Sequence, residues 1–354
     1  MHFPWCVRKC PYCDFNSHPL HGGLDEARYL RALLEDLNSA QATWPTDITT
    51  VFFGGGTPSL FSPGSFATLC QALACAGEVT MEANPGASEH AEFGGYLEAG
   101  INRLSLGAQS FDDEMLSRLG RIHAATDTRA AFAAAREAGF DNINLDLMYA
   151  LPGQSVAGAL EDLRAAVSLA PEHVSWYQLT LEPKTEFYQR PPVLPEDGLV
   201  AEIEAAGYEL LTEAGYERYE VSAWAQPGRR CEHNVNYWSF GDYLGIGAGA
   251  HGKIAGLRTE KPKAPSRYLQ EPAAVTKQEI KRDAVVFEVM MNALRLVDGI
   301  SWARFEEATE IDAQTLAEPW RALHEQGLVE RDRVQTTPFG FRHLDAVVAS
   351  FLPA

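Results

Sequence analysis

Three cysteines crowded near the start of the chain constrain its fold and chemistry more than any other feature. Cys6, Cys10 and Cys13 have the spacing C-x3-C-x2-C. A structural zinc site needs four ligands, usually in two separated pairs. No second C-x2-C pair follows, and Cys70 and Cys75, in an apolar helical stretch, are interpreted as core residues. A [4Fe–4S] cluster is commonly held by four thiolates. Three thiolates therefore indicate a cluster with one open iron that can bind and activate a small molecule. The alternative interpretation is three unrelated buried cysteines.

Length and composition are those of a globular protein. The 354 residues suggest roughly two domains, although one barrel can reach about 250 residues. The sequence contains no run of about 18 apolar residues and no signal peptide. Six cysteines, three of them clustered, argue against a disulfide scaffold. We therefore expect a cytoplasmic protein without an integral membrane segment.

The net charge of −19 bears on possible partners. A general nucleic-acid binder needs a basic surface, so the charge argues against this class. Basic residues gather only at Arg229–Arg230 and, mildly, over residues 253–263. Both patches are interpreted as solvated surface.

Apolar periodicity predicts alternating strands and helices. Strands are expected at residues 48–53, 78–83, 102–107, 142–148, 173–181 and 216–223. Helices are expected at residues 25–42, 65–76, 89–99, 112–119, 127–138, 155–169 and 196–214. Short links between them are typical of parallel βαβ units. With a strand before the cysteines, the pattern gives six units and one extra strand, which fits either a flat doubly wound sheet or a partial barrel.

Polar groups at the strand ends favour the barrel. The glycine turn at residues 54–57, Glu82, Gln109, Asp146 and Thr180 lie at or just past the ends of successive strands. A ring of polar groups at the carboxyl ends of parallel strands is how (β/α) barrels build active sites. The prediction is an α/β fold, a partial (β/α)6 TIM-like barrel.

The chain begins abruptly. Residues 1–5 are interpreted as the tail of a strand that runs into the cysteine loop. Either this first strand is short, or Met1 is an internal start within the natural gene.

The C-terminal part differs in composition. We predict a barrel domain over residues 1–255, a linker over 256–281 and a helical domain over 282–354. The linker prediction rests on abundant Pro, Lys and Arg without apolar periodicity. Helices at 282–296, 302–308, 313–326 and 344–352, with a β-hairpin at 327–341, suggest a small winged-helix-like module. Because the chain is acidic, a lid or docking role is favoured over DNA binding.

The turn Gly54-Gly55-Gly56-Thr57-Pro58 follows one predicted strand. Consecutive glycines let the backbone approach a ligand and leave N–H groups free to bind it. The turn is neither a P-loop nor a G-x-G-x-x-G motif.

The cysteine spacing, Tyr12 before the third cysteine and the glycine turn together resemble the radical S-adenosylmethionine (SAM) superfamily. The resemblance implies that the open iron chelates the amino and carboxylate groups of SAM. Reductive cleavage of SAM would then release a 5′-deoxyadenosyl radical. Relatives carry a SAM-binding tyrosine just upstream of the first cysteine, and this sequence begins too late to contain it.

A closer resemblance is to the oxygen-independent coproporphyrinogen III oxidase group and, within it, to HemW-type haem chaperones. It rests on the glycine turn and on the segments Glu82-Ala-Asn-Pro85, residues 105–111, residues 118–123 and residues 144–153. The resemblance implies that Gly55, Gly56 and Thr57 bind the SAM methionine moiety. It also implies that Glu82, Gln109, Arg121 and Asp146 line the rest of the SAM pocket.

Two departures separate this chain from the oxidases. They carry a fourth cysteine two residues after the third, where this sequence has Phe15. They also have a long N-terminal extension, which is absent here. Both differences match the HemW type, which as a group is considered not to oxidise coproporphyrinogen.

The segment His233-Asn234-Val-Asn-Tyr237 has the form H-N-x-x-Y, which the resemblance associates with haem. His and Tyr are both known haem iron ligands. A hydrogen-bonded structural histidine is the alternative, and His251, His2, His18 and His21 are rival ligands.

The sequence thus predicts a radical SAM protein, with cofactors [4Fe–4S], SAM and haem, that passes haem to an acceptor protein. By resemblance, the acceptor is a haem-requiring enzyme of the respiratory membrane, and the protein is a monomer or homodimer. Oxidative decarboxylation of coproporphyrinogen III is the enzymatic alternative. A purely structural cluster is a third, and the open coordination position argues against it.

Overall fold

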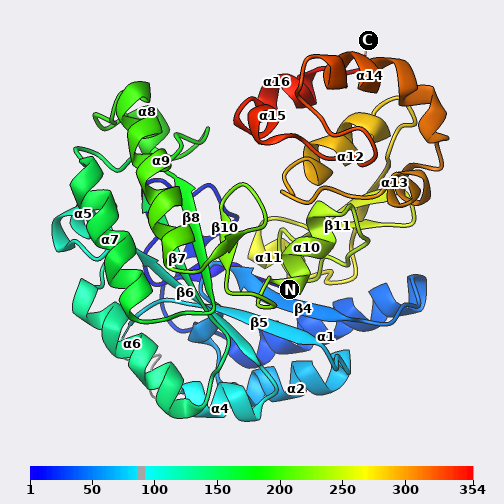
Figure 1. Cartoon of the computed structure of the whole chain (residues 1–354). Helices are drawn as coiled ribbons and strands as arrows, with labels where there is room; N and C mark the ends of the chain where they lie inside the picture. Colours follow the sequence, from blue (N-terminus) through cyan, green and yellow to red (C-terminus); the bar gives the residue numbers. More distant parts are fainter. Residues whose placement is uncertain (87–91, 354) are drawn as a thin grey trace.

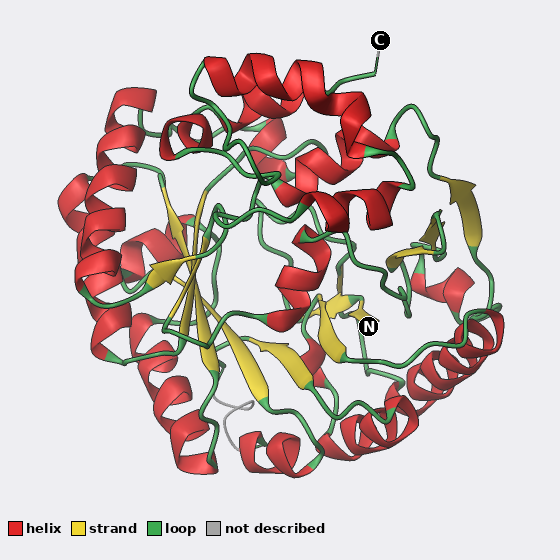
Figure 2. Ribbon diagram, turned by 45° about the vertical axis from the view of Figure 1, so that its right-hand side comes forward, coloured by secondary structure: helices red, strands yellow, loops and turns green. Residues whose placement is uncertain are grey.

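The computed structural model describes residues 1–86 and 92–353. A curved sheet with helices on its outer side forms the larger part, and a mainly helical C-terminal part packs beside it (Figures 1 and 2). In spatial order the main sheet consists of β1 (His2–Phe3), β4 (Thr50–Gly55), β5 (Glu78–Ala83), β6 (Arg103–Gln109), β7 (Ile143–Tyr149), β8 (His173–Gln178), β10 (Ala223–Ala225) and β9 (Glu217–Arg218).

The order of these strands confirms the partial barrel. From β1 to β8 every neighbouring pair is parallel. β10 then pairs antiparallel with both β8 and β9, so the single strand predicted at residues 216–223 is a short antiparallel pair. β1 and β9 are the two ends of this order, so the sheet is open.

Helices follow the strands along the chain, and most of them cover the outer face of the sheet (Figure 1). They are α1 (Glu26–Thr43), α2 (Pro63–Leu73), α4 (Phe93–Glu98), α5 (Asp113–Arg118), α6 (Ala125–Ala138), α7 (Val156–Ser168), α8 (Glu186–Gln189) and α9 (Asp197–Glu213), with a 3-10 turn η1 (Pro58–Leu60). α8 instead lies against the cysteine loop, where Phe187 N donates to Pro11 O. α1 begins where the Asp25 side chain accepts a hydrogen bond from Arg28 N, which satisfies a free backbone donor. The helix predicted at 89–99 includes residues 89–91, which lie outside the described residues.

The two faces of the strands have opposite character. Alternate residues such as Val79, Met81 and Leu104 are buried against the helices in the main core. The intervening residues, among them Ser105 and Asp146, carry polar groups that hydrogen-bond across the strands. Because side chains alternate between the faces of a strand, the inner face of the barrel is largely polar.

The first residues join the sheet as predicted. β1 pairs with the end of β4, and β2 (Trp5–Cys6) pairs with β3 (His18–Pro19). Phe3 is fully buried, with its ring centroid 4.8 Å from that of Phe61. The chain therefore runs from a core strand directly into the cysteine loop.

Residues 256–281, predicted to be a linker, contain regular secondary structure. β11 (His251–Ile254), β12 (Leu257–Glu260) and β13 (Thr276–Glu279) form an antiparallel sheet, and α11 (Pro265–Tyr268) lies between the last two. Tyr268 is fully buried and donates a hydrogen bond to Asp36. All four residues of β13 are exposed, so backbone pairing rather than apolar burial holds this strand, and no periodicity marked it.

The C-terminal helices are α10 (Glu232–Trp238), α12 (Val285–Ala293), α13 (Trp302–Thr309), η2 (Ala313–Leu316), α14 (Ala317–Glu325), α15 (Pro338–Arg342) and α16 (Leu344–Ala349). They form a second core that also includes Tyr219 and Ala223 from the sheet edge. The predicted hairpin is reduced to an isolated bridge between Val329 and Thr336. Its second arm ends early because Thr337 caps α15. None of the helices in the described part of the chain is long and apolar enough to cross a membrane.

Candidate functional site

A cavity of about 480 Å³ lies at the carboxyl ends of the parallel strands. Every residue predicted to hold the cluster or SAM lines it: Cys6, Cys10, Cys13, Gly55, Gly56, Thr57, Glu82, Gln109, Arg121 and Asp146. Thr180, the remaining predicted strand-end group, lines it too. Its volume lies within the range of about 300–1,000 Å³ that is usual for small-molecule sites.

The cysteine loop is shaped by its own hydrogen bonds. Cys13 N donates to Cys10 O at 3.2 Å, and Leu20 N donates to Cys6 O at 2.8 Å. Lys9 Nζ reaches across the loop to the carbonyl oxygens of Phe15 and Ser17, at 2.9 and 3.1 Å. The three thiols are half-buried and share one cavity, which is the donor set that a cluster with one open iron requires. Burial raises the pKa of Cys6 and of Cys13.

The glycine turn lies against the strand that leads to Cys6. Gly56 N donates to Phe3 O at 2.6 Å, and Thr57 N donates to Trp5 O at 2.7 Å. A Cβ atom on Gly56 would lie 2.5 Å from Trp5 O, so this approach requires glycine. Gly55 has φ +111°, a conformation that side chains rarely adopt.

Two acidic residues face the cavity from β5 and β7. Glu82 Oε2 accepts a hydrogen bond of 2.9 Å from Gly55 N. Burial, followed by the charge of Asp146, raises the pKa of Glu82 to about 7. Asp146 accepts from Ser105 Oγ at 2.8 Å and from Asn144 Nδ2 at 2.9 Å, and burial raises its pKa as well. The site therefore holds carboxyl groups that a cationic ligand would help to ionise.

Gln109 ends β6 in a strained conformation. Its φ of +66° is unusual for a residue with a side chain. The pairing of β6 with β7 shifts register between Leu106 and Gln109, and the Tyr177 hydroxyl donates to Gln109 Oε1 at 2.7 Å. Such strain at a cavity is typical of functional sites.

Arg121 reaches the cysteine loop from the segment after α5. Its Nη1 lies 3.6 Å from Cys10 Sγ. Its Nη2 donates to Asn84 Oδ1 at 2.6 Å and to Gly107 O at 2.9 Å. The guanidinium thus brings a fixed positive charge to the cavity.

A polar network inside the barrel was missed by the sequence analysis. The Tyr219 hydroxyl donates to His173 Nε2 at 2.8 Å, and His173 Nδ1 donates to Asn144 Oδ1 at 2.6 Å. Asn144 continues the network to Asp146. The sequence does carry a signal for this network, because strands such as Ile143–Tyr149 alternate apolar and polar residues. Among the strand residues, only those at the strand ends were predicted as site residues.

The H-N-x-x-Y motif lies far from the cysteines. It forms most of α10, and His233 contacts Thr50 and Phe52 near the amino end of β4. The glycine turn begins at the carboxyl end of the same strand, where Gly55 lies five residues from Thr50, a rise of roughly 17 Å. The structure therefore separates the motif from the cluster loop instead of bringing them together.

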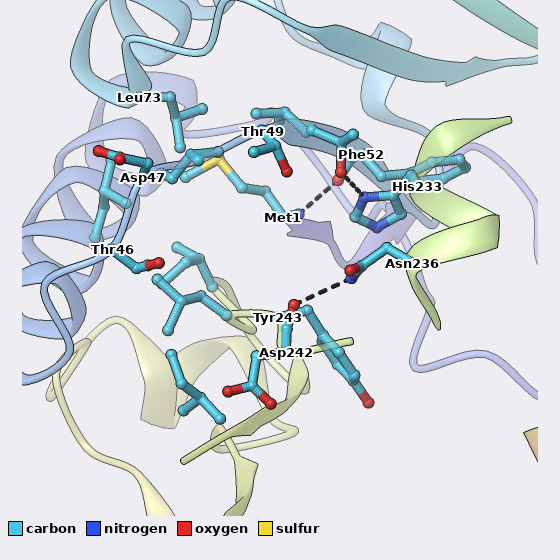
Figure 3. A pocket seen from close by; sticks show the side chains of 17 residues that line it. Met1, Thr46, Asp47, Thr49, Phe52, Leu73, His233, Asn236, Asp242 and Tyr243 are labelled. Atoms are coloured by element: carbon cyan, nitrogen blue, oxygen red, sulfur yellow. Dashed lines mark hydrogen bonds between the residues drawn. The ribbon is translucent and has the colours of Figure 1, made fainter. Parts of the chain in front are cut away.

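His233 lines a cavity of about 120 Å³ (Figure 3). Its ring stacks on Phe52, with centroids 5.4 Å apart, and meets Tyr237 edge-on at 4.9 Å. Burial, followed by the positive charges of the Met1 α-amino group and Arg103, lowers the pKa of His233 to about 3. Asn236 lines this cavity, whereas Asn234 and Tyr237 are not among its described lining residues.

The rival histidines lie elsewhere. His2, near Gly55, bonds Asn16 O through Nε2 at 2.9 Å. Burial lowers its pKa, and the charge of the Met1 α-amino group lowers it further. His251 is exposed, 3.9 Å from Glu260. None of the four rival histidines, His2, His18, His21 and His251, lines the cavity beside His233 in the described chain.

Three cysteines, a glycine turn and polar strand ends around one cavity define the radical SAM class. The family profile described as "Radical SAM superfamily" matches residues 1–166, and that described as "HemN C-terminal domain" matches residues 280–343. Membership implies a [4Fe–4S] cluster and SAM as cofactors.

Individual relatives identify the family within the radical SAM class to which the chain belongs. The chain is 43% identical to "Heme chaperone HemW" of Escherichia coli strain K12, over 99% of this chain and 97% of that protein. It is 42% identical to the protein of the same name from Haemophilus influenzae, with the same coverage. The chain belongs to the HemW family. The solved structure of coproporphyrinogen III oxidase (HemN) from Escherichia coli has the same fold, with a TM-score of 0.84 at 23% identity over 99% of this chain and 88% of that one.

Proposed function

We propose that the protein binds haem and passes it to an acceptor protein. The observation that carries the proposal is the similarity, over nearly the whole chain, to proteins named haem chaperones. The H-N-x-x-Y helix supports it, since His233 and Tyr237 offer an imidazole and a phenol of the kind that bind haem iron.

Haem binding at this helix requires movement. The cavity beside His233, at about 120 Å³, is smaller than the roughly 300 Å³ at which small-molecule sites begin. The residues around it must therefore part, or the haem must lie across its mouth with His233, Asn234 and Tyr237 at one edge.

We assign the larger cavity to the cluster and SAM. Cys6, Cys10 and Cys13 would hold three irons, and SAM would bind across the fourth. Gly55, Gly56 and Thr57 would contact the methionine moiety, and Glu82, Gln109, Arg121 and Asp146 would surround the rest: these are the family positions that line the cavity. The cluster and SAM would supply reductive SAM chemistry, which serves or gates the transfer of haem.

The acceptor we propose is a haem-requiring enzyme of the respiratory membrane. Transfer is tested by mixing the haem-loaded protein with respiratory membranes from haem-depleted cells and following the recovery of oxidase activity. Free haem at the same concentration is the control. Recovery no faster than with free haem would contradict the carrier role.

Haem binding itself is tested on the full-length protein, reconstituted anaerobically with iron and sulfide. Titration with haem is followed by Soret absorbance for wild type, His233→Ala and His21→Ala, which replaces an exposed histidine. We expect His233→Ala alone to weaken binding. Addition of SAM, reductant and coproporphyrinogen III tests the alternative, and robust formation of protoporphyrinogen IX would establish an oxidase instead.

A further inference from the structure

The amino end of α10 is fixed by one buried carboxylate. Glu78 begins β5 and is 8% exposed. Its Oε1 accepts hydrogen bonds from Cys231 Sγ and His233 N, and its Oε2 accepts one from Glu232 N, each 3.2 Å long. One side chain thus accepts three hydrogen bonds from the residues at the start of α10, the helix that carries the H-N-x-x-Y motif.

The same carboxylate has a buried cationic partner. Arg103, at the start of β6, is 1% exposed, and its Nε lies 3.8 Å from Glu78 Oε2. A buried arginine without a counter-charge is costly. Glu78 therefore links the start of α10 to the buried guanidinium of Arg103.

A second contact fixes the His233 ring. His233 Nδ1 and Thr50 Oγ1 lie 2.8 Å apart, in hydrogen-bond geometry. A neutral histidine binds iron through a nitrogen that carries no proton, and the partner of the other nitrogen decides which one that is. If Nδ1 donates to Thr50 Oγ1, Nε2 keeps its lone pair for a ligand.

We infer that Thr50 and Glu78 are positioning residues for a haem centre at the end of the barrel opposite to the cluster, an inference that rests on the proposed haem-binding function. Thr50 holds the tautomer and orientation of the His233 imidazole. Glu78 holds the backbone from which that imidazole projects. Both residues act through His233 and need no contact with haem.

The first test uses Thr50→Val, which keeps the shape of the side chain and removes its hydroxyl. Loss of a hydrogen bond to a metal-binding histidine costs about 10- to 100-fold in affinity. We expect Thr50→Val to weaken haem binding by at least about tenfold with a changed Soret band, and Thr50→Ser, which restores the hydroxyl, to recover both.

Thr80→Val is the matched control. Thr80 lies on β5 between Glu78 and Glu82, is fully buried, and its Oγ1 has no hydrogen-bond partner in the described structure. This variant also removes a barrel-interior hydroxyl and is expected to bind haem as wild type does. Equal losses in Thr50→Val and Thr80→Val would overturn the inference, because the effect would then be general packing.

Glu78→Gln provides the second variant. The amide cannot accept all three hydrogen bonds or balance Arg103, so we expect weaker haem binding while cluster absorbance and SAM binding are retained. Wild-type affinity in both Glu78→Gln and Thr50→Val, with binding still lost in His233→Ala, would overturn the inference and leave the haem function intact. Absence of haem binding in the wild type, or binding unaffected by His233→Ala, would remove the haem site itself.

Discussion

The guanidinium of Arg121 contacts the thiol of Cys10: Nη1 lies 3.6 Å from Sγ while Nη2 is held by Asn84 and Gly107. A hydrogen bond to a cluster sulfur stabilises the more negatively charged, reduced state of the cluster. The same residue lines the cavity that we propose as the SAM site. Arg121 is therefore expected to influence both the redox potential of the cluster and the binding of SAM.

Arg121→Met should make the midpoint potential of the reconstituted cluster more negative by tens of millivolts. The physical reason is the loss of a charge-assisted hydrogen bond, a contact worth about 1.5–3 kcal/mol, only part of which differs between the two oxidation states. Redox titration followed by electron paramagnetic resonance measures this shift. Arg31→Met, which replaces an exposed residue of α1, is the control. An unchanged potential in Arg121→Met would show that the contact does not persist with the cluster bound.

Glu82→Gln should stabilise the protein at alkaline pH while weakening SAM binding. The pKa of Glu82 is raised to about 7, against an ordinary value near 4.5. Between these two values the folded state holds a proton that the unfolded state has released, so the stability contributed by protonated Glu82 is lost as pH rises towards 7 and above. The uncharged amide avoids this loss.

The measurement compares the urea midpoints of Glu82→Gln and wild type at pH 5.5 and pH 8.5. The variant should gain stability relative to wild type at the higher pH, and isothermal titration should show weaker binding of SAM. A difference between the two proteins that is the same at both pH values would contradict the raised pKa.

Gly56→Ala should disrupt the contact between the glycine turn and residues 3–5, which lead into the cysteine loop. The added methyl group would lie 2.5 Å from Trp5 O and 2.7 Å from Phe3 O, and backbone atoms cannot move aside cheaply. Overpacking of this kind costs about 1–3 kcal/mol or more. We expect a lower thermal midpoint and poor cluster reconstitution, measured by iron content. Gly94→Ala, where nothing lies within 4 Å of the new Cβ, should reconstitute normally, and a Gly56→Ala protein with full iron content would refute the steric argument.

The strands and the cluster cavity could be predicted because their signals are local. β4 is apolar and ends in glycines, and the three cysteines lie within eight residues. Parallel strands bring their carboxyl ends together, so Glu82 and Asp146 were placed in one site without knowledge of any side-chain contact.

The position of the H-N-x-x-Y motif could not be predicted in this way. The helix is held by Glu78, 155 residues before His233, and nothing in the sequence around either residue indicates that pairing. Similarly, β13 is polar and exposed, and only its backbone pairing with β12 makes it a strand. Long-range hydrogen bonds without an apolar pattern therefore account for what the sequence analysis missed.

His123 should destabilise the protein as pH falls. It is 7% exposed, its Nε2 lies 3.1 Å from Ala108 O, and burial, followed by the charge of Arg121, lowers its pKa to about 4. An unfolded chain takes up this proton near pH 6.5. Stability is therefore fully present above about pH 6.5 and is lost as pH falls towards 4, by up to about 3 kcal/mol for the full difference in pKa.

Other buried groups titrate in the same range, so the wild-type profile alone does not isolate this effect. The raised pKa values of Glu82 and of Asp162, the latter about 6, make those carboxyls stabilising as pH falls. The informative quantity is the difference between His123→Gln and wild type, because the amide can still donate to Ala108 O and does not titrate. Urea unfolding at pH 7.5 and pH 4.5 should show the variant losing less stability than wild type, whereas His21→Gln, at an exposed site, should follow wild type. If His123→Gln also follows wild type, His123 must gain its proton in the folded state near pH 6.5, which its burial beside Arg121 opposes.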